Sequence, residues 1–291
     1  MLTTFTCLLA CALTGAAGDT LDGAAAGLEK PGSAYTSGPL WVWNDLLSTE
    51  QIETTLDALA ASNIRQVWVH PRPGLMTPYL DTDWFARWAD TLRVAKKHDM
   101  LVWIYDENSY PTCFAGGLLP EAMPESRALG LKVEDRKRVK PSDPSVFAVY
   151  KKTVNGFEMI AKDAAGDGFL DGEFVVVTLE QAKESPWYGG KFHTDLLRPG
   201  VTEKFLEITL DAYKKHFGDE FGKRIPGSFY DEPHLKGAGE MHWTPDFAER
   251  FQEVWGRDFM AELPLLKADT PEGRRFRHNY FHTLNRLFIE R

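Results

Sequence analysis

Short apolar runs alternate with segments of helical period from Leu40 onward, and this alternation restricts the fold more than any other feature. Such alternation is typical of βαβ units, in which parallel strands are covered by helices. The first apolar runs span residues 40–43, 67–69 and 101–105. A capping box, Ser48 to Gln51, begins the first helical segment. We therefore expect an α/β fold built on a parallel sheet.

The alternation is interrupted between residues 131 and 184, where the pattern is typical of antiparallel strands and contains the hairpin dipeptide Asn155-Gly156. It resumes with candidate strands near residues 192–196 and 225–230, followed by helices that begin at Thr244-Pro245 and Thr270-Pro271. We expect a (β/α)8 barrel of the TIM type, truncated after its fifth strand. Its small antiparallel β insertion, at about residues 131–184, follows the third strand.

The first 18 residues carry no charge and are typical of a secretory leader without its basic start. Residues 8–11 also match a lipoprotein cleavage box, in which Cys11 would carry the lipid anchor. Residues 19–38 read as a tether, and residues 39–291 as the partial barrel domain. These features predict an extracytoplasmic protein, either periplasmic, anchored to the outer membrane or secreted. The alternative is a leader that is merely apolar.

Composition excludes several classes of protein. The formal net charge of −9 argues against nucleic acid as a partner, because phosphate binding needs a basic face. Three cysteines form neither a disulfide framework nor a zinc motif. No apolar stretch is long enough to span a bilayer. The pattern does not predict an oligomeric state.

Each of the five expected strands ends in a polar residue. These residues are Asn44, His70, Asp106, Asp195 and Asp231. In parallel α/β folds ligands bind at the carboxyl ends of the strands, so the set predicts a binding or catalytic site. The alternative is that strand ends are polar simply because they are exposed.

Two acidic pairs, Asp106-Glu107 and Asp231-Glu232, follow the third and fifth strands. Glycoside hydrolysis needs two carboxyl groups around one bond, one protonated and one ionised. Glu232 is the first candidate for the general acid, because Pro233 restricts it to an extended backbone. An ion pair or a loop cap is the alternative role.

Other side chains are candidates for sugar binding. Trp187 lies in a loop where its ring fits a sugar platform or a hydrophobic plug, and His193 shares a strand face with Asp195. Asn44 and His70 would complete the pocket. Cys113 is expected to pack rather than to act as a nucleophile, because no catalytic partner is identifiable.

Several motifs resemble those of one enzyme family. They span residues 39–44, 103–111, 114–117, 195–199 and 229–233. In this order they resemble bacterial barrel glycoside hydrolases of the α-L-rhamnosidase type (family 106) and their relatives, over residues 39–260.

The resemblance implies an α/β barrel that hydrolyses glycosidic bonds by inversion, with calcium near the sugar in some members. Asp106, Glu107, Asp231 and Glu232 match the acidic motifs. Thr112-Cys113 departs from the family, which more often has Ser-Gly there. The resemblance also implies a second catalytic carboxylate beyond Arg291.

We therefore predict an exported glycoside hydrolase that acts on oligo- or polysaccharide by carboxylate acid/base catalysis. The residues require no cofactor, and calcium is implied only by the resemblance. Two alternatives are a noncatalytic carbohydrate-binding surface protein and an inactive fragment of a larger glycosidase. A metal-dependent hydrolase using His70 and Asp231 is a weaker reading, because the sequence holds no HxH pair.

Overall fold

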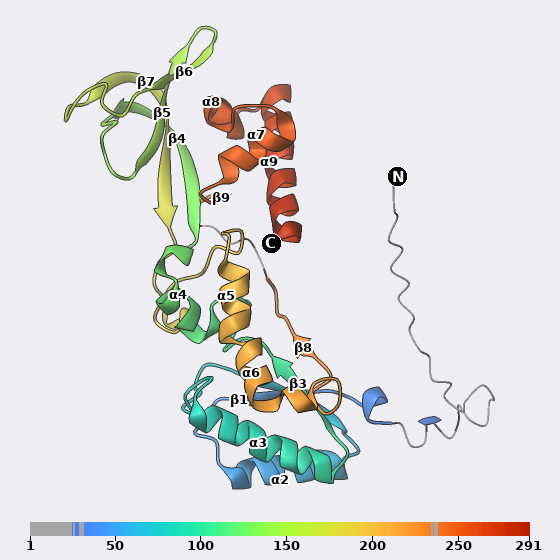
Figure 1. Cartoon of the computed structure of the whole chain (residues 1–291). Coiled ribbons are helices and arrows are strands. Elements are labelled where there is room, and N and C mark those ends of the chain that lie inside the picture. Colours follow the sequence, from blue (N-terminus) through green and yellow to red (C-terminus); the bar gives the residue numbers. More distant parts are fainter. Residues whose placement is uncertain (1–24, 26, 29–31, 234, 236–237) are drawn as a thin grey trace, which may run out of the picture.

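The computed structural model describes residues 25, 27–28, 32–233, 235 and 238–291. The predicted leader, with Cys11, and most of the predicted tether lie outside these residues. Within the described part of the chain, no helix combines the length and the apolar character needed to cross a membrane. Figure 1 shows a parallel sheet at one end of the molecule, an antiparallel sheet at the other, and α4 (Leu118–Ala122) and α5 (Val201–Ile208) between them.

Four strands form the parallel sheet, in the order β1-β2-β3-β8. They are β1 (Leu40–Trp43), β2 (Gln66–Pro71), β3 (Leu101–Tyr105) and β8 (Ser228–Phe229). Trp68 pairs with Trp103, and Tyr105 with Phe229. We call these strands, with α2 (Thr49–Ala61), α3 (Thr82–Lys97) and α6 (Leu210–Phe217), the parallel region.

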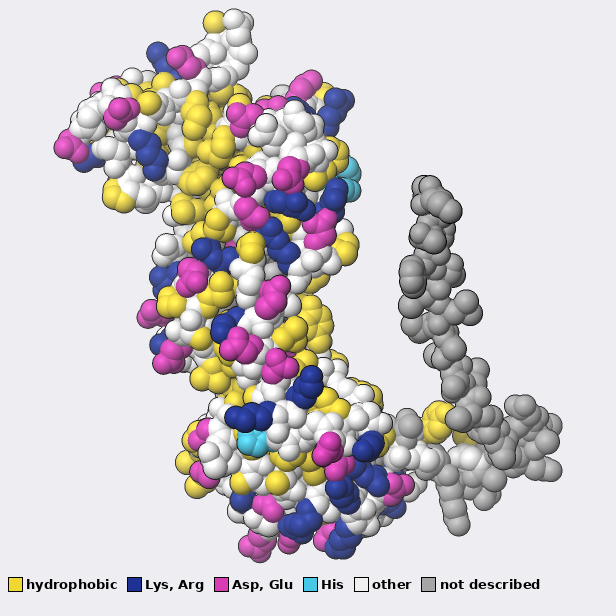
Figure 2. Space-filling view, viewed as in Figure 1, with side chains coloured by type: hydrophobic (Ala, Val, Ile, Leu, Met, Phe, Trp, Pro, Cys, Tyr) yellow, Lys and Arg dark blue, Asp and Glu magenta, His cyan; other side chains and the backbone are white. Residues whose placement is uncertain are grey.

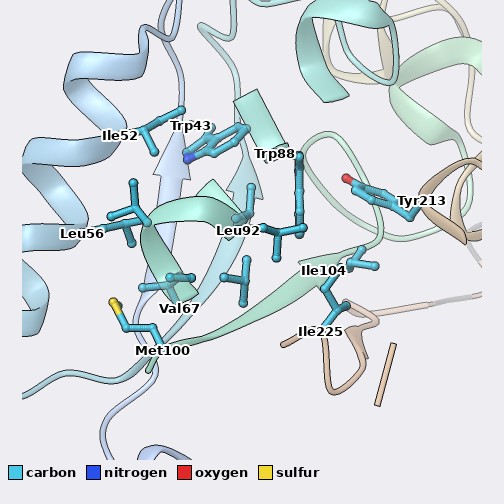
Figure 3. Packing of buried hydrophobic residues seen from close by; sticks show 14 of the residues in the cluster. Trp43, Ile52, Leu56, Val67, Trp88, Leu92, Met100, Ile104, Tyr213 and Ile225 are labelled. Carbon is cyan, nitrogen blue, oxygen red and sulfur yellow. The ribbon is translucent and has the colours of Figure 1, made fainter. Parts of the chain in front are cut away.

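Helices cover one face of this sheet, as the sequence predicts. Ser48 and Gln51 form the expected capping box at the start of α2. The apolar stripe of α3 includes Trp84 and Trp88, which are fully buried against Trp43 of β1. Figure 3 shows this core between the helices and the strands.

The opposite face of the sheet is aromatic. The ring of Trp68 stacks on that of Trp103 with centroids 4.3 Å apart, and Phe229 packs edge-on against Trp68 at 5.5 Å. All three side chains are only half-buried. Alternate residues of each strand therefore contribute either to the helix-covered core or to this aromatic layer.

The expected TIM-type (β/α)8 barrel is wrong. The parallel sheet has four strands and stays open, and the fourth expected strand, near residues 192–196, is absent. That segment makes only an isolated antiparallel bridge between Thr194 and Arg127. Its apolar residues Phe192, Leu196 and Leu197 are buried in a loop rather than in a sheet.

Five strands form the antiparallel sheet, in the order β6-β5-β7-β4-β9. They are β4 (Leu129–Val139), β5 (Val146–Thr153), β6 (Gly156–Ile160), β7 (Leu170–Gln181) and β9 (Met241–Trp243). The antiparallel strands expected at about residues 131–184 are thus present, with the predicted Asn155-Gly156 hairpin. The sequence pattern missed β9, which joins the sheet from more than 50 residues further along the chain.

Three helices cover this second sheet and complete what we call the antiparallel region. They are α7 (Phe247–Trp255), α8 (Phe259–Glu262) and α9 (Pro271–Glu290). Thr270 caps α9 as predicted, whereas α7 begins later than Thr244-Pro245. Figure 2 shows hydrophobic side chains gathered between the antiparallel sheet and these helices.

Candidate active site

Two of the predicted carboxylates lie side by side at the carboxyl edge of the parallel sheet. Asp106 follows β3 and Asp231 follows β8, and these two strands are neighbours. The Asp106 amide donates to the carbonyl oxygen of Phe229 at 3.1 Å, which continues the strand pairing up to the site. The parallel sheet therefore brings together two acids that are 125 positions apart in sequence.

Thr112 and Tyr105 connect the two acids. The Thr112 hydroxyl donates to Oδ1 of Asp106 at 3.0 Å and accepts from the Asp231 amide at 2.8 Å. The Tyr105 hydroxyl donates to Oδ2 of Asp231. These contacts hold both side chains in fixed orientations, so the pair is preorganised.

The environments of the two acids differ. Asp106 is 3% exposed, whereas Asp231 is half-buried. Burial, reinforced by the nearby charge of Glu107, raises the pKa of Asp106 to about 8, although the Thr112 hydrogen bond acts in the opposite direction. Asp106 is therefore mostly protonated at neutral pH. The Tyr105 hydroxyl donates a hydrogen bond to the Asp231 carboxyl group.

His70 lies beside this pair. Its ring stacks on Tyr105 at 3.8 Å, and the side chain is 4% exposed. Among the described residues, neither ring nitrogen has a hydrogen-bond partner. Burial, with the positive charge of Arg72, lowers the pKa of His70 to about 4, so the ring is neutral and has both a donor and an acceptor to offer.

Glu107 faces away from these groups and holds the loop that follows β3. One carboxylate oxygen accepts from the amides of Asn108 and Gly116, and the other accepts from three successive amides, those of residues 113–115. Burial raises the pKa of Glu107 to about 7, against the effect of these amides. Five donors around one carboxylate leave no position for a substrate, which points to a structural role.

Glu232, the expected general acid, differs from its prediction in two respects. Its side chain is exposed, and its φ of +45° is left-handed rather than extended. Pro233 therefore does not impose the extended backbone that the sequence suggested, because the turn after β8 prevails over the local preference.

His193 and Asp195 lie in a loop beside the one that follows β3, because the hydroxyl of the intervening Thr194 donates to the Cys113 carbonyl oxygen. Asp195 is fully buried and accepts from the ring of His242 on β9 at 3.0 Å. Nδ1 of His193 lies 2.8 Å from the Thr194 carbonyl oxygen, and its ring packs edge-on against Tyr188. The expected fourth strand does not form, so neither residue is part of the parallel sheet.

Trp187 and Asn44 flank the site. Trp187 lies in the short helix η4 (Pro186–Tyr188), and its indole donates to the Tyr110 carbonyl at 2.5 Å. Its loop packs directly on the loop after β3, because a Cβ on Gly189 would lie 2.0 Å from the Gly116 carbonyl oxygen. Asn44 is exposed at the end of β1. The loop after β2 packs closely on it, because a Cβ added to Gly74 would lie 3.0 Å from the Asn44 carbonyl oxygen.

Four residues that make contacts in or near the site were not predicted from the sequence. They are Tyr105, Thr112, Arg72 and His242. Tyr105 alternates with Trp103 along β3, so strand periodicity identifies its face. The contacts of Thr112, Arg72 and His242 join segments far apart in the chain, and no local pattern indicates them.

A cavity of about 610 Å³ lies between α3 and α6, away from the strand ends. Basic side chains such as Lys96 and Lys214 line it. No member of the site described above contributes to it. We therefore choose the strand ends as the candidate site for their buried polar contacts and the raised pKa of Asp106, rather than for cavity volume.

The calcium implied by the family resemblance has no evident set of protein ligands here. Across the described residues, no group of three or more His, Cys, Asp or Glu side chains is arranged to hold a metal ion. His70 and Asp231 interact electrostatically, but a third such ligand does not join them. We assign no step to a metal.

Comparison with known proteins shows a fold relationship. No family model matches the chain, and no curated protein matches it in sequence. A rhamnosidase from Novosphingobium sp. PP1Y is similar in structure, with a TM-score of 0.60 and 13% sequence identity. The similarity covers 90% of this chain and 44% of the rhamnosidase. The chain thus shares the fold of part of a glycoside hydrolase.

Proposed function

We propose that this chain is a glycoside hydrolase domain in which Asp106 donates a proton to the leaving oxygen and Asp231 is the ionised partner. The observation that carries the proposal is the buried Asp106, whose pKa is raised to about 8, held beside Asp231 by Thr112. Two carboxyl groups whose environments separate their protonation states are what glycosidic bond cleavage needs.

The role of each acid follows from its surroundings. Asp106 is protonated near neutral pH because burial disfavours its anion. Asp231 is more accessible and accepts from Tyr105, which favours a charge that can stabilise an oxocarbenium ion or activate water. His70, with two unpartnered nitrogens next to Tyr105, would bind a sugar hydroxyl.

The fold similarity to a rhamnosidase supports the class of reaction, and rhamnose as the sugar is the finer proposal. Substrate would be an oligo- or polysaccharide side chain. The apolar leader with Cys11 supports an exported location. Fractionation of cells that express the full chain tests that location separately from the activity.

Hydrolysis of a panel of aryl glycosides, including an aryl α-L-rhamnoside, tests the reaction and the acid. We expect Asp106→Asn to lower kcat/KM by about 100-fold or more, since acid/base groups contribute at least that much. Activity of the unmodified chain should fall as pH rises through about 8, because Asp106 then loses its proton. Glu134→Gln, a carboxylate on β4 remote from the site, is the matched control.

Glu232→Gln separates the two candidate acids. If this variant loses activity while Asp106→Asn stays within about tenfold of the unmodified chain, Glu232 is the proton donor and our assignment is wrong. If both variants are inactive, the pH profile of the unmodified chain decides. A loss of activity through pH about 8 supports Asp106, and a profile without that loss contradicts the assignment.

A noncatalytic sugar-binding protein is the second candidate. The exposed ring of Trp187, 37% accessible beside the strand ends, favours it because aromatic faces bind sugar rings. This function predicts that oligosaccharides bind without turnover and that Trp187→Ala abolishes the binding. Titration calorimetry with simultaneous analysis of products distinguishes the two candidates.

A further inference from the structure

Arg72 lies against two aromatic rings next to the candidate active site. It directly follows β2, and its guanidinium carbon lies 5.0 Å from the centroid of the Tyr110 ring and 6.0 Å from that of Trp187. The two rings meet edge-to-face with centroids 5.1 Å apart. These contacts hold the cation against the two rings.

The Arg72 guanidinium has no anionic partner. Among the described residues, none forms a hydrogen bond or an ion pair with it, although it is half-buried. Other arginines of the same region are paired: Arg87 with Asp90, and Arg224 with Asp99. An ordered, partly desolvated and unpaired guanidinium is a ready site for an anion.

A small pocket of about 110 Å³ opens beside this cation. Its wall contains Arg72, Trp187 and the first residues of the loop after β3, Asn108 and Ser109. Ser109 is 3% exposed, and its hydroxyl has no hydrogen-bond partner. The pocket thus combines a positive charge, an unsatisfied hydroxyl and an aromatic face, and no carboxylate lines it.

The pocket belongs to the same edge of the sheet as the two acids. Arg72 follows β2 and Asn108 follows β3, the strand that leads to Asp106. The charge of Arg72 acts on both His70 and Tyr105, and the Tyr105 hydroxyl donates to Asp231 on this edge. A sugar bound in the pocket would therefore lie next to the sugar that is cleaved.

We propose that this pocket binds the carboxylate of a uronic acid residue in the substrate. Arg72 forms the bidentate contact that its planar fork makes with a carboxylate, and the Ser109 hydroxyl donates a further hydrogen bond. Trp187 stacks on the sugar ring. This inference rests on the proposed function and deepens it, because it specifies an acidic glycan as the substrate class.

Binding of matched oligosaccharides to the full chain tests the proposal. Calorimetry compares a uronate-containing disaccharide with the same disaccharide after reduction of its carboxyl group. We expect about 10- to 100-fold tighter binding of the acidic sugar, which corresponds to hydrogen bonds with a charged group. Added salt should weaken that preference, because the contact is partly exposed.

Variants of Arg72 show which residue carries the preference. Arg72→Met keeps the apolar stem and should abolish the discrimination, whereas Arg72→Lys keeps the charge without the fork and should retain part of it. Arg93→Met, on the exposed surface of α3, is the matched control and should bind like the unmodified chain. Circular dichroism of each variant checks that it is folded.

The outcomes separate this inference from the proposed function. Preference for the uronate without hydrolysis supports the pocket and contradicts the glycosidase assignment. Equal binding of acidic and neutral sugars, or a preference that survives Arg72→Met, overturns the pocket, whatever the activity. Equal affinity for a sulfated disaccharide also overturns it, because the site would then bind any anion.

Discussion

Two carboxylates, one in each region, have opposite environments. In the parallel region, Asp106 is buried beside another acid and its pKa rises to about 8. In the antiparallel region, Glu134 on β4 lies between Lys132 and Arg136 at the surface, and these hydrogen bonds lower its pKa to about 2. Burial without a counter-charge prepares a carboxyl group for proton transfer, whereas pairing at the surface keeps one permanently ionised.

The two regions also differ in what fills their interiors. The core of the antiparallel region is built from interlocking aromatic rings, such as Phe247, Phe259 and Tyr280, with centroids 5.0–6.3 Å apart. The parallel region has an aromatic core too, and its carboxyl edge adds His70 and Ser109, buried groups for which the described residues offer no hydrogen-bond partner. The antiparallel region also buries such groups, at His242 and Thr244, so the two regions differ in where these groups lie rather than in whether they have them.

The largest effect is expected from removing a ring from the antiparallel core. Phe259 is 1% exposed and stacks on Phe276. Changing it to alanine should lower the free energy of unfolding by about 3–5 kcal/mol. Urea unfolding measures this loss. Phe281→Ala, at a position 54% exposed on α9, is the control and should change stability by about 0.5 kcal/mol at most. Equal losses would show that the aromatic core is loosely packed.

A smaller effect is expected from neutralising the carboxylate that holds the loop after β3. Glu107→Gln turns an NH2 group towards two or three of the five amide donors, so it should cost about 2–3 kcal/mol. Glu134→Gln makes the same chemical change at the surface and should cost no more than about 0.5 kcal/mol. Chemical denaturation of the two variants measures the contrast, and similar costs would remove the distinction between the regions.

The smallest expected effect, given as the change in the free energy of unfolding for each pH unit, concerns Asp106. Its pKa is raised on folding, so the folded state holds a proton that the unfolded state has released between pH ~4 and about 8. Asp106 should therefore lower stability as pH rises through this interval, by at most about 1.4 kcal/mol per pH unit. Glu107, whose pKa is raised to about 7, acts in the same direction up to that pH. His70, whose pKa is lowered, acts oppositely below pH ~6.5.

The comparison with Asp106→Asn isolates the carboxyl group, because His70 contributes equally to both chains. The stability advantage of the variant should grow with pH and level off above about 8. Thermal unfolding across this range measures it. A constant difference between the two chains would mean that folding does not perturb Asp106.

Local patterns predicted most of the elements. The capping box at Ser48, the hairpin at Asn155-Gly156 and the cap at Thr270 were each confirmed, since these signals depend on residues within one turn of chain. The barrel prediction failed because the apolar run at residues 192–196 packs as a loop. Apolar character indicates burial, and it does not by itself specify strand pairing.

The candidate site was predictable only in part. His70 lies at the end of β2, and Asp106 and Asp231 follow β3 and β8. These strands do pair, so reading the strand ends placed the three residues together. Asp195 was expected to join them on the strength of a strand that does not form. The hydrogen bonds of Thr112 and the unpaired charge of Arg72 depend on tertiary contacts, which residue spacing does not contain.

The close packing of Gly189 on Gly116 has a consequence for how such a protein can evolve. A side chain at position 189 would collide with the backbone of the loop after β3, so this crossing can change only if both loops move together. The side chains that these loops present to the pocket, Trp187 and Asn108, have no such restriction. Single substitutions of these side chains can therefore change the ligand preference, although the loop crossing itself tolerates few substitutions. New specificities can then arise without a new fold.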